Sequence, residues 1–239
     1  MTAIGELVRG MRDTRSALLP VALMALLGAA VFAFLQLADE VGEDELGAID
    51  EALLLLFRDP SDRSQVIGPP WLEETMVEIT ALGGYPILVV MVAVVVGYLF
   101  MMRMAGPALF VLASIVTGTI AGHVLKLVYD RPRPDIVDHL VAIHTPSFPS
   151  GHATMSAVVY LTLASLIMRL VDSTLVRGYV LSVAVLLTLA VGISRVYLGV
   201  HWPSDVAAGW ALGVAWASLS WLVVAALRVY RERAREKAR

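Results

Sequence analysis

The stretch Ser194-Arg-Val-Tyr-Leu-Gly-Val-His-Trp-Pro-Ser-Asp205 decides the fold, because it lies between two long apolar segments, residues 178–194 and 206–227. Pro203 suits the first turn of a helix, where the N–H that proline lacks would have no partner. Arginine, histidine and aspartate are costly inside a bilayer and are favoured near its surface. The stretch therefore predicts a turn at a membrane surface that joins two membrane-spanning helices.

Composition extends this prediction to the whole chain. Of its 239 residues 58% are hydrophobic and 16% are charged, and the mean hydropathy is +0.77. A helix needs about 20 mostly apolar residues to cross a bilayer. Uncharged apolar stretches occupy residues 17–37, 79–102, 104–122, 153–168, 178–194 and 206–227, of which the fourth and fifth are short for a crossing. We therefore expect an all-α, integral membrane six-transmembrane-helix bundle in a single domain, residues 1–239.

The charges around these stretches predict their orientation. Residues 39–84 contain twelve acidic and two basic residues, whereas the tail 228–239 contains six basic and two acidic residues. The N-terminal segment 1–16 adds three arginines, and the first apolar stretch is too long for a cleaved signal peptide. Because basic segments stay in the cytoplasm, we expect both termini on the cytoplasmic side. We expect the chain itself in the cell inner membrane. Residues 39–84 would then form an extracytoplasmic cap of about two short helices.

Three separated segments place polar residues at the outer mouths of the expected helices. They are Lys126-Leu-Val-Tyr-Asp-Arg-Pro-Arg133-Pro134, Pro149-Ser-Gly-His152 and the stretch from Ser194 to Asp205. An ionisable group costs about 2.5–3.5 kcal/mol at the bilayer centre and less near the surface, so several at one level indicate a shared anionic partner. Lys126, Arg133 and Arg195 together suit a phosphate. Ser150 is placed as a helix N-cap beside free N–H groups, and Gly151 allows close approach.

Two histidines in these segments can carry out phosphoryl transfer. His201 and Asp205 are four residues apart, so the carboxylate can fix the tautomer of the imidazole and leave its other nitrogen free to attack phosphorus. His152, from a different helix, is then available to protonate the leaving oxygen. The structural alternatives are a helix-capping pair for His201 with Asp205, and interfacial placement for Lys126.

Two neighbouring groups are interpreted as structural. Asp130 and Arg131 are adjacent and are expected to pair with each other. His123 lies one turn before Lys126 and is expected to form a hydrogen bond between packed helices.

The pattern Lys126-x6-Arg133-Pro134, Pro149-Ser150-Gly151-His152 and Ser194-Arg195-x5-His201-x3-Asp205 resembles the three-part signature of the type 2 phosphatidic acid phosphatase family. The resemblance covers mainly residues 104–227, the expected catalytic core. It implies a phosphohistidine on His201, supported by Asp205, with His152 as the general acid. It also implies that Lys126, Arg133, Ser150, Gly151 and Arg195 bind the phosphate, and that no metal and no cofactor takes part.

The sequence thus predicts a metal-independent phosphatase that acts on a phosphomonoester or diphosphate bond of a lipid at the outer membrane surface. Undecaprenyl diphosphate, phosphatidate and phosphatidylglycerol phosphate all remain open as substrates. Two alternative functions fit the motifs less well. A phospholipid transporter or scramblase would use the cations only to hold a head group and would not need two histidines. A vanadate-dependent peroxidase is disfavoured because it would release its oxidant into lipid. Besides membrane lipids no partner is indicated, since no basic stripe for nucleic acid exists outside the tail, and the oligomeric state is left open.

Overall fold

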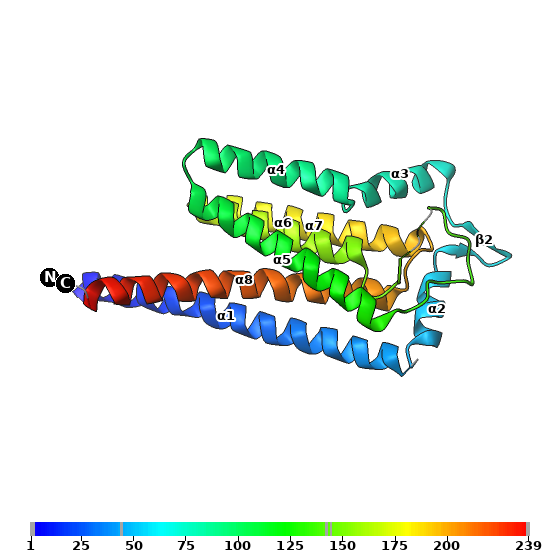
Figure 1. The fold of residues 1–239 in the computed structure, drawn as a ribbon, viewed down its shortest axis with the longest axis horizontal. Coiled ribbons are helices and arrows are strands. Elements are labelled where there is room, and N and C mark those ends of the chain that lie inside the picture. Colours follow the sequence, from blue (N-terminus) through cyan, green and yellow to red (C-terminus); the bar gives the residue numbers. More distant parts are fainter. Residues whose placement is uncertain (1–2, 44, 142, 144, 238–239) are drawn as a thin grey trace.

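The computed structural model describes residues 3–43, 45–141, 143 and 145–237, so parts of both charged tails, 1–16 and 228–239, lie outside it. The described chain is mostly helical (Figure 1). Its helices are α1 (Ala3–Gly42), α2 (Gly47–Leu55), α3 (Pro70–Ala81), α4 (Tyr85–Met101), α5 (Ala105–Tyr129), α6 (Gly151–Leu170), α7 (Thr174–Tyr197) and α8 (Pro203–Lys237). The long helices α1 and α8 lie side by side, and both chain ends are at the same end of the bundle.

Within the described residues, five helices are long and apolar enough to cross a membrane, or six if the bent pair α3 and α4 counts as one span, by length and composition alone. The expectation of one continuous helix over residues 79–102 is wrong. α3 ends at Ala81 and α4 starts at Tyr85, and their axes meet at 46°. Gly83 lies at this break, where a Cβ atom would be 2.3 Å from Val191 Cγ1 on α7. The break therefore lets the chain approach α7 closely before it turns into α4.

The two stretches that looked short form helices long enough to cross a membrane. α6 has 20 residues and α7 has 24, because the helices continue through charged residues at their ends. Arg169 lies in the last turn of α6, and Arg195 lies in the last turn of α7. Arginine side chains can bury their apolar stems and keep the charged group near the interface, so these ends are compatible with spanning helices.

The segment expected to form two short helices contains α2 and α3, and also a hairpin that the sequence analysis did not predict. Strands β1 (Arg58–Asp59) and β2 (Asp62–Val66) pair in an antiparallel manner. Arg58 is buried, and its Nη1 donates to Tyr197 O at 2.9 Å. This bond ties the hairpin to the end of α7, near the turn that carries His201.

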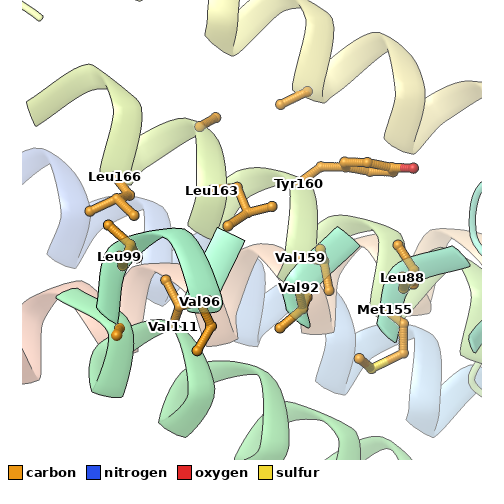
Figure 2. Close-up of a cluster of buried hydrophobic side chains, with 13 residues drawn as sticks. Leu88, Val92, Val96, Leu99, Val111, Met155, Val159, Tyr160, Leu163 and Leu166 are labelled. Carbon is orange, nitrogen blue, oxygen red and sulfur yellow. The ribbon is translucent and has the colours of Figure 1, made fainter. Parts of the chain in front are cut away.

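α6 is the central helix of the bundle. In its apolar window 67% of the residues are buried, compared with 17–28% in the other four single-helix candidate spans. Figure 2 shows the largest buried cluster, in which α6 packs against α4 and α5. Its labelled side chains are Leu88, Val92, Val96 and Leu99 from α4, Val111 from α5, and Met155, Val159, Tyr160, Leu163 and Leu166 from α6. The start of α6, with its polar motif, is thus held firmly at one end of the bundle.

Candidate active site

The three polar segments meet at the end of the bundle opposite the chain termini, where α5 and α7 end and α6 and α8 begin (Figure 1). α5 ends at Tyr129 because Asp130 takes a left-handed conformation, with φ at 39°, and prolines follow. α8 begins at Pro203, as the sequence predicts. The backbone N–H of Ser150 donates to Asp205 O at 2.9 Å, which joins the second segment to the third.

His201 and Asp205 form the buried centre of this site. Their side chains are 2% and 0% exposed, and His201 Nδ1 lies 3.3 Å from Asp205 Oδ2. His201 Nε2 lies 3.1 Å from Nη1 of Arg133, which can only donate. Nε2 must therefore be the acceptor, and Nδ1 carries the proton that is directed to Asp205. This tautomer leaves the lone pair of Nε2 facing the cationic side of the site.

The environment keeps the imidazole of His201 neutral. Burial lowers its pKa to about 3, and the positive charges of Arg133 and Arg195 act in the same direction. The hydrogen bond and the charge of Asp205 oppose this shift but do not overcome it. A neutral imidazole is the form that can act as a nucleophile.

Asp205 is fully satisfied in its buried position. Its Oδ1 accepts from Arg131 at 2.6 Å, and its Oδ2 accepts from the backbone N–H of Trp202 at 2.9 Å. Ser147 donates a further hydrogen bond to Oδ2, and its hydroxyl lies 3.4 Å from His201 Nδ1. A buried carboxylate with this many donors remains ionised and fixed in orientation.

The three predicted cations surround the histidines. Lys126 Nζ donates to Pro146 O at 2.7 Å, and Arg133 Nε donates to Thr145 O at 2.8 Å. Burial lowers the pKa of Arg133, although nearby Asp205 opposes the shift. These bonds to backbone carbonyls orient the cations without neutralising their charge, so a binding site for an anion remains.

Arg195 gives the strongest indication of a missing ligand. It is 2% exposed, and its Nη1 donates to Thr80 Oγ1 at 3.0 Å. Its Nε and Nη2 are buried and have no hydrogen-bond partner among the described residues. Leaving guanidinium donors unpaired in a buried place is costly, so the geometry favours an anion that would accept from them.

The second segment has the predicted helix start, with one difference. Ser150 is the N-cap of α6, but its hydroxyl makes no capping bond and is buried without a partner in the described chain. A Cβ on Gly151 would lie 3.5 Å from Lys126 Cε, an ordinary contact distance, so space alone does not require glycine there. His152 follows at the start of α6, partly buried, and makes no side-chain hydrogen bond with the described residues. Its imidazole is therefore free to interact with a ligand.

The expected pairing of Arg131 with Asp130 is wrong. Arg131 instead forms ion pairs with Asp205 and with Asp50 of α2, at 2.6 and 2.9 Å. The sequence offered one signal for this, namely an arginine expected on the extracytoplasmic side, where basic residues are otherwise scarce, which therefore needed a partner. Asp50 itself had no distinguishing feature among twelve acidic residues.

His123 agrees with its structural interpretation. Its Nδ1 lies 3.0 Å from Thr119 O in its own helix and 3.5 Å from the Tyr85 hydroxyl of α4. These contacts link α5 to α4 outside the cationic cluster.

Comparisons with known proteins agree on one family. Residues 107–228 match the model of the PAP2 superfamily. The chain is 35% identical over 182 residues to phosphatidylglycerophosphatase B of Bacillus subtilis (strain 168), covering 76% of this chain and 86% of that one. It is 34% identical over 110 residues to an undecaprenyl-diphosphatase of Sulfolobus acidocaldarius, covering 44% and 48%. The crystal structure of a transmembrane PAP2-type phosphatidylglycerolphosphate phosphatase from Bacillus subtilis superposes with a TM-score of 0.72 at 32% identity, covering 84% and 93%.

Proposed function

The chain belongs to the PAP2 superfamily and is a membrane lipid phosphatase, and we propose that it transfers the phosphate of its lipid to His201 and then to water. Two features of the site together carry this proposal. His201 is neutral and its Nε2 lone pair faces Arg133, and the buried Nε and Nη2 of Arg195 have no hydrogen-bond partner among the described residues. A phosphate between the two arginines would lie beside the nucleophile and satisfy those donors.

In the first step, the lone pair of His201 Nε2 attacks phosphorus as the bond from phosphorus to the lipid oxygen breaks. Arg133 shifts its N–H from Nε2 to a phosphate oxygen, because a lone pair engaged in a hydrogen bond cannot attack. His152 gives a proton to the departing lipid alkoxide. Lys126 and Arg195 balance the negative charge on the transferring group.

In the second step, water attacks the phosphohistidine. His152, now neutral, takes a proton from the water, and the phosphorus–nitrogen bond returns its electron pair to Nε2. Asp205 holds Nδ1–H throughout, so that the same ring nitrogen is restored after each cycle. Inorganic phosphate leaves, and the site returns to its starting protonation state.

An apolar cavity supports a lipid as the substrate. It has a volume of about 400 Å³ and lies between α4, α5 and α6, with Tyr85, Ala93, Ile120 and Met155 among its lining residues. Thr119, which also lines it, lies on α5 two turns before Lys126. An acyl or prenyl chain in this cavity would place its head group near the cations.

Of the three lipids left open by the sequence, we favour phosphatidylglycerol phosphate. The match to phosphatidylglycerophosphatase B covers 76% of this chain and 86% of that one, and that relative is named for this activity. The test is phosphate release by the purified protein from phosphatidylglycerol phosphate, phosphatidate and undecaprenyl diphosphate in mixed micelles, with His201→Ala as the control. Highest kcat/KM on phosphatidylglycerol phosphate supports the proposal. Release from none of the three overturns it, and a preference for another lipid overturns only the substrate assignment.

We further propose that α3 and α4 together make one bent span, giving six spans, with the site and the cap formed by α2, the hairpin and α3 on the extracytoplasmic side. The scarcity of basic residues in 39–84, two compared with six in the tail 228–239, supports this placement. The sequence has no cysteine, so Gln65→Cys on β2 and Asp172→Cys between α6 and α7 can be probed with an impermeant thiol reagent on intact cells. Gln65→Cys should be labelled and Asp172→Cys should not, and the opposite pattern would reverse the topology.

We also propose that the cations of the site make a metal unnecessary. Lys126, Arg133 and Arg195 supply the positive charge that a divalent ion would otherwise provide. Activity should survive treatment with a chelator, and vanadate should inhibit because it adopts the shape of the transferring phosphoryl group. Loss of activity with chelator that magnesium restores would contradict this part of the proposal.

A further inference from the structure

Asp50 is a buried carboxylate that the proposed mechanism does not use. It lies on α2, within the acidic segment 39–84, yet it is 2% exposed. Its Oδ1 accepts from the backbone N–H of Ser204 at 2.8 Å, and its Oδ2 accepts from the Ser204 hydroxyl. Asp50 therefore binds the first turn of α8, where helix N–H groups have no partner within the helix and the helix dipole favours a negative charge.

Arg131 connects Asp50 to the catalytic pair. Its Nη2 donates to Asp50 Oδ2 at 2.9 Å, and its Nη1 donates to Ser204 Oγ at 2.8 Å and to Asp205 Oδ1 at 2.6 Å. The guanidinium also lies over the ring of Trp202, with Cζ 5.7 Å from the ring centroid. One planar group thus holds two carboxylates and a hydroxyl at fixed angles.

The backbone of Arg131 contributes to the same arrangement. Its carbonyl accepts from the N–H of Ser147 at 2.8 Å, and the hydroxyl of Ser147 donates to Asp205 Oδ2. Both oxygens of Asp205 are therefore oriented through Arg131, one by its side chain and one through Ser147. The direction in which Asp205 meets His201 Nδ1 depends on this connection.

Stability alone does not account for such a network. Replacing a buried ion pair by apolar groups is often neutral or stabilising, because burying the charges costs as much as their attraction returns. A network that joins α2, the loop after α5 and the start of α8 at one carboxylate is better suited to fixing geometry than to adding stability.

We propose that Asp50 and Arg131 are positioning residues, which hold Asp205 and the start of α8 so that His201 presents an unprotonated Nε2 to the phosphate. The inference rests on the proposed function. It gives the segment 39–84 a role in catalysis, since α2 supplies the carboxylate that anchors Arg131.

The decisive variant is Asp50→Asn, which keeps the side-chain shape and one acceptor but removes the charge that Arg131 binds. The matched control is Glu51→Gln, the neighbouring carboxylate on α2, which is exposed and pairs with exposed Arg63 at 3.3 Å. With a soluble aryl phosphate, Asp50→Asn should lower kcat on the order of 10-fold, the lower end of what losing an outer partner of a functional histidine costs. KM should change little, because Asp50 touches none of the three cations, and Glu51→Gln should match the wild type.

A second readout separates positioning from a merely structural role. The measurement is NMR of protein labelled with ¹⁵N-histidine, in which the His201 signals are assigned by their loss in His201→Gln. The wild type should show one tautomer of His201, with Nδ1 protonated and Nε2 unprotonated. Asp50→Asn should show a mixture of the two tautomers. An unchanged kcat, or a lower kcat with the tautomer unchanged, overturns the inference.

If Asp50→Asn does not fold, Ser204→Ala makes the same test with both charges kept, and it should shift the tautomer and lower kcat by a smaller factor. No effect of Ser204→Ala on either measurement would then overturn the inference. If the wild type releases no phosphate from any substrate, the proposed function falls, while the tautomer measurement still tests whether Asp50 orients His201.

Discussion

The α6–α8 contact and the α4–α5 pair are built in opposite ways. On α8, a Cβ at Gly213 would lie 2.3 Å from the Cβ of Ala157, and a Cβ at Gly209 would lie 2.8 Å from Ser150 O. On α4, Gly97 is exposed and a Cβ there would meet no described atom within 4 Å, and a cavity of about 400 Å³ lies between α4, α5 and α6. The first pair of helices is packed backbone to backbone, whereas the second leaves room for another molecule.

The difference in packing corresponds to the number of candidate site residues that each pair of helices contributes. α6 and α8 begin with His152 and with the turn that holds His201, and catalysis needs these groups held to within a fraction of an ångström. Small residues let the two helices approach closely, and this is how helices associate where no hydrophobic effect drives them together. α4 and α5 contribute fewer site residues, so a looser contact is compatible with lipid entry.

The strongest test of the catalytic pair of helices is His201→Ala. We expect turnover to fall by about 10⁴-fold or more with every substrate, because removing a nucleophile eliminates the covalent route. Quenching wild type under non-acidic conditions with labelled substrate should trap an acid-labile phosphoenzyme that the variant lacks. Substantial turnover in His201→Ala would place the nucleophile elsewhere.

His152→Ala should have a large effect that depends on the leaving group. With a lipid phosphate we expect a loss of about 10²–10⁴-fold, the usual contribution of general acid catalysis. With an aryl phosphate the loss should be much smaller, since a phenolate leaves without a proton. The ratio of kcat/KM for the two substrates measures the contrast, and equal losses would argue that His152 binds phosphate rather than donating a proton.

The packing contrast itself is tested by the same substitution at two glycines. Gly213→Ala should destabilise the protein by about 1–3 kcal/mol, because the added methyl overpacks the contact with Ala157. Gly97→Ala should be neutral or stabilising by about 0.5–1 kcal/mol, because alanine is favoured over glycine in a helix and space is free. Thermal unfolding in detergent measures both. Equal effects at the two positions would mean that the contact between Gly213 and Ala157 is not tightly packed.

Filling the cavity should impair lipid substrates alone. Ala93→Phe would place a ring in the space between α4 and α5, where it would displace about two methylene groups of a bound lipid chain. At about 0.8 kcal/mol for each methylene, the KM for lipid should rise roughly 10-fold. Activity on a soluble aryl phosphate should be unchanged. The control is Val94→Phe, whose position is 66% exposed and does not line the cavity. A KM for lipid that Ala93→Phe leaves unaltered would show that the chain binds elsewhere.

The smallest predicted effect concerns pH and the burial of His201. Its pKa is about 3 in the folded protein, below the value of about 6.5 in an unfolded chain. The unfolded state therefore gains a proton as pH falls through 6.5 while the folded state does not, which costs about 1 kcal/mol of stability between pH 7 and pH 5.5. His201→Gln should show a smaller drop in Tm over this range than the wild type. An equal drop would mean that the imidazole is accessible to protons in the folded state.

Much of the candidate site could be predicted because its chemistry depends on the types of residue present and on their spacing along the chain. Lys126, Arg133, Arg195, His152 and His201 lie in three short segments, and each segment lies near the end of an apolar run. The turn that leads into α8 then brings Asp205 to His201, four residues away, without any long-range information. The tautomer of His201, in contrast, depends on Arg133, which is 68 residues away in the chain.

The sequence by itself predicted a mostly helical membrane protein, its approximate spans and the candidate residues of the cationic site, because hydrophobic runs and local spacing depend on neighbours along the chain. The tertiary structure alone decided that α3 and α4 are separated by a bend, that a hairpin lies in the cap, and that Arg131 binds Asp50 rather than Asp130. Asp50 and Arg131 are 81 positions apart. Which of many acidic residues becomes buried against an arginine depends on the packing of α2 against α8, and the local sequence does not contain that information.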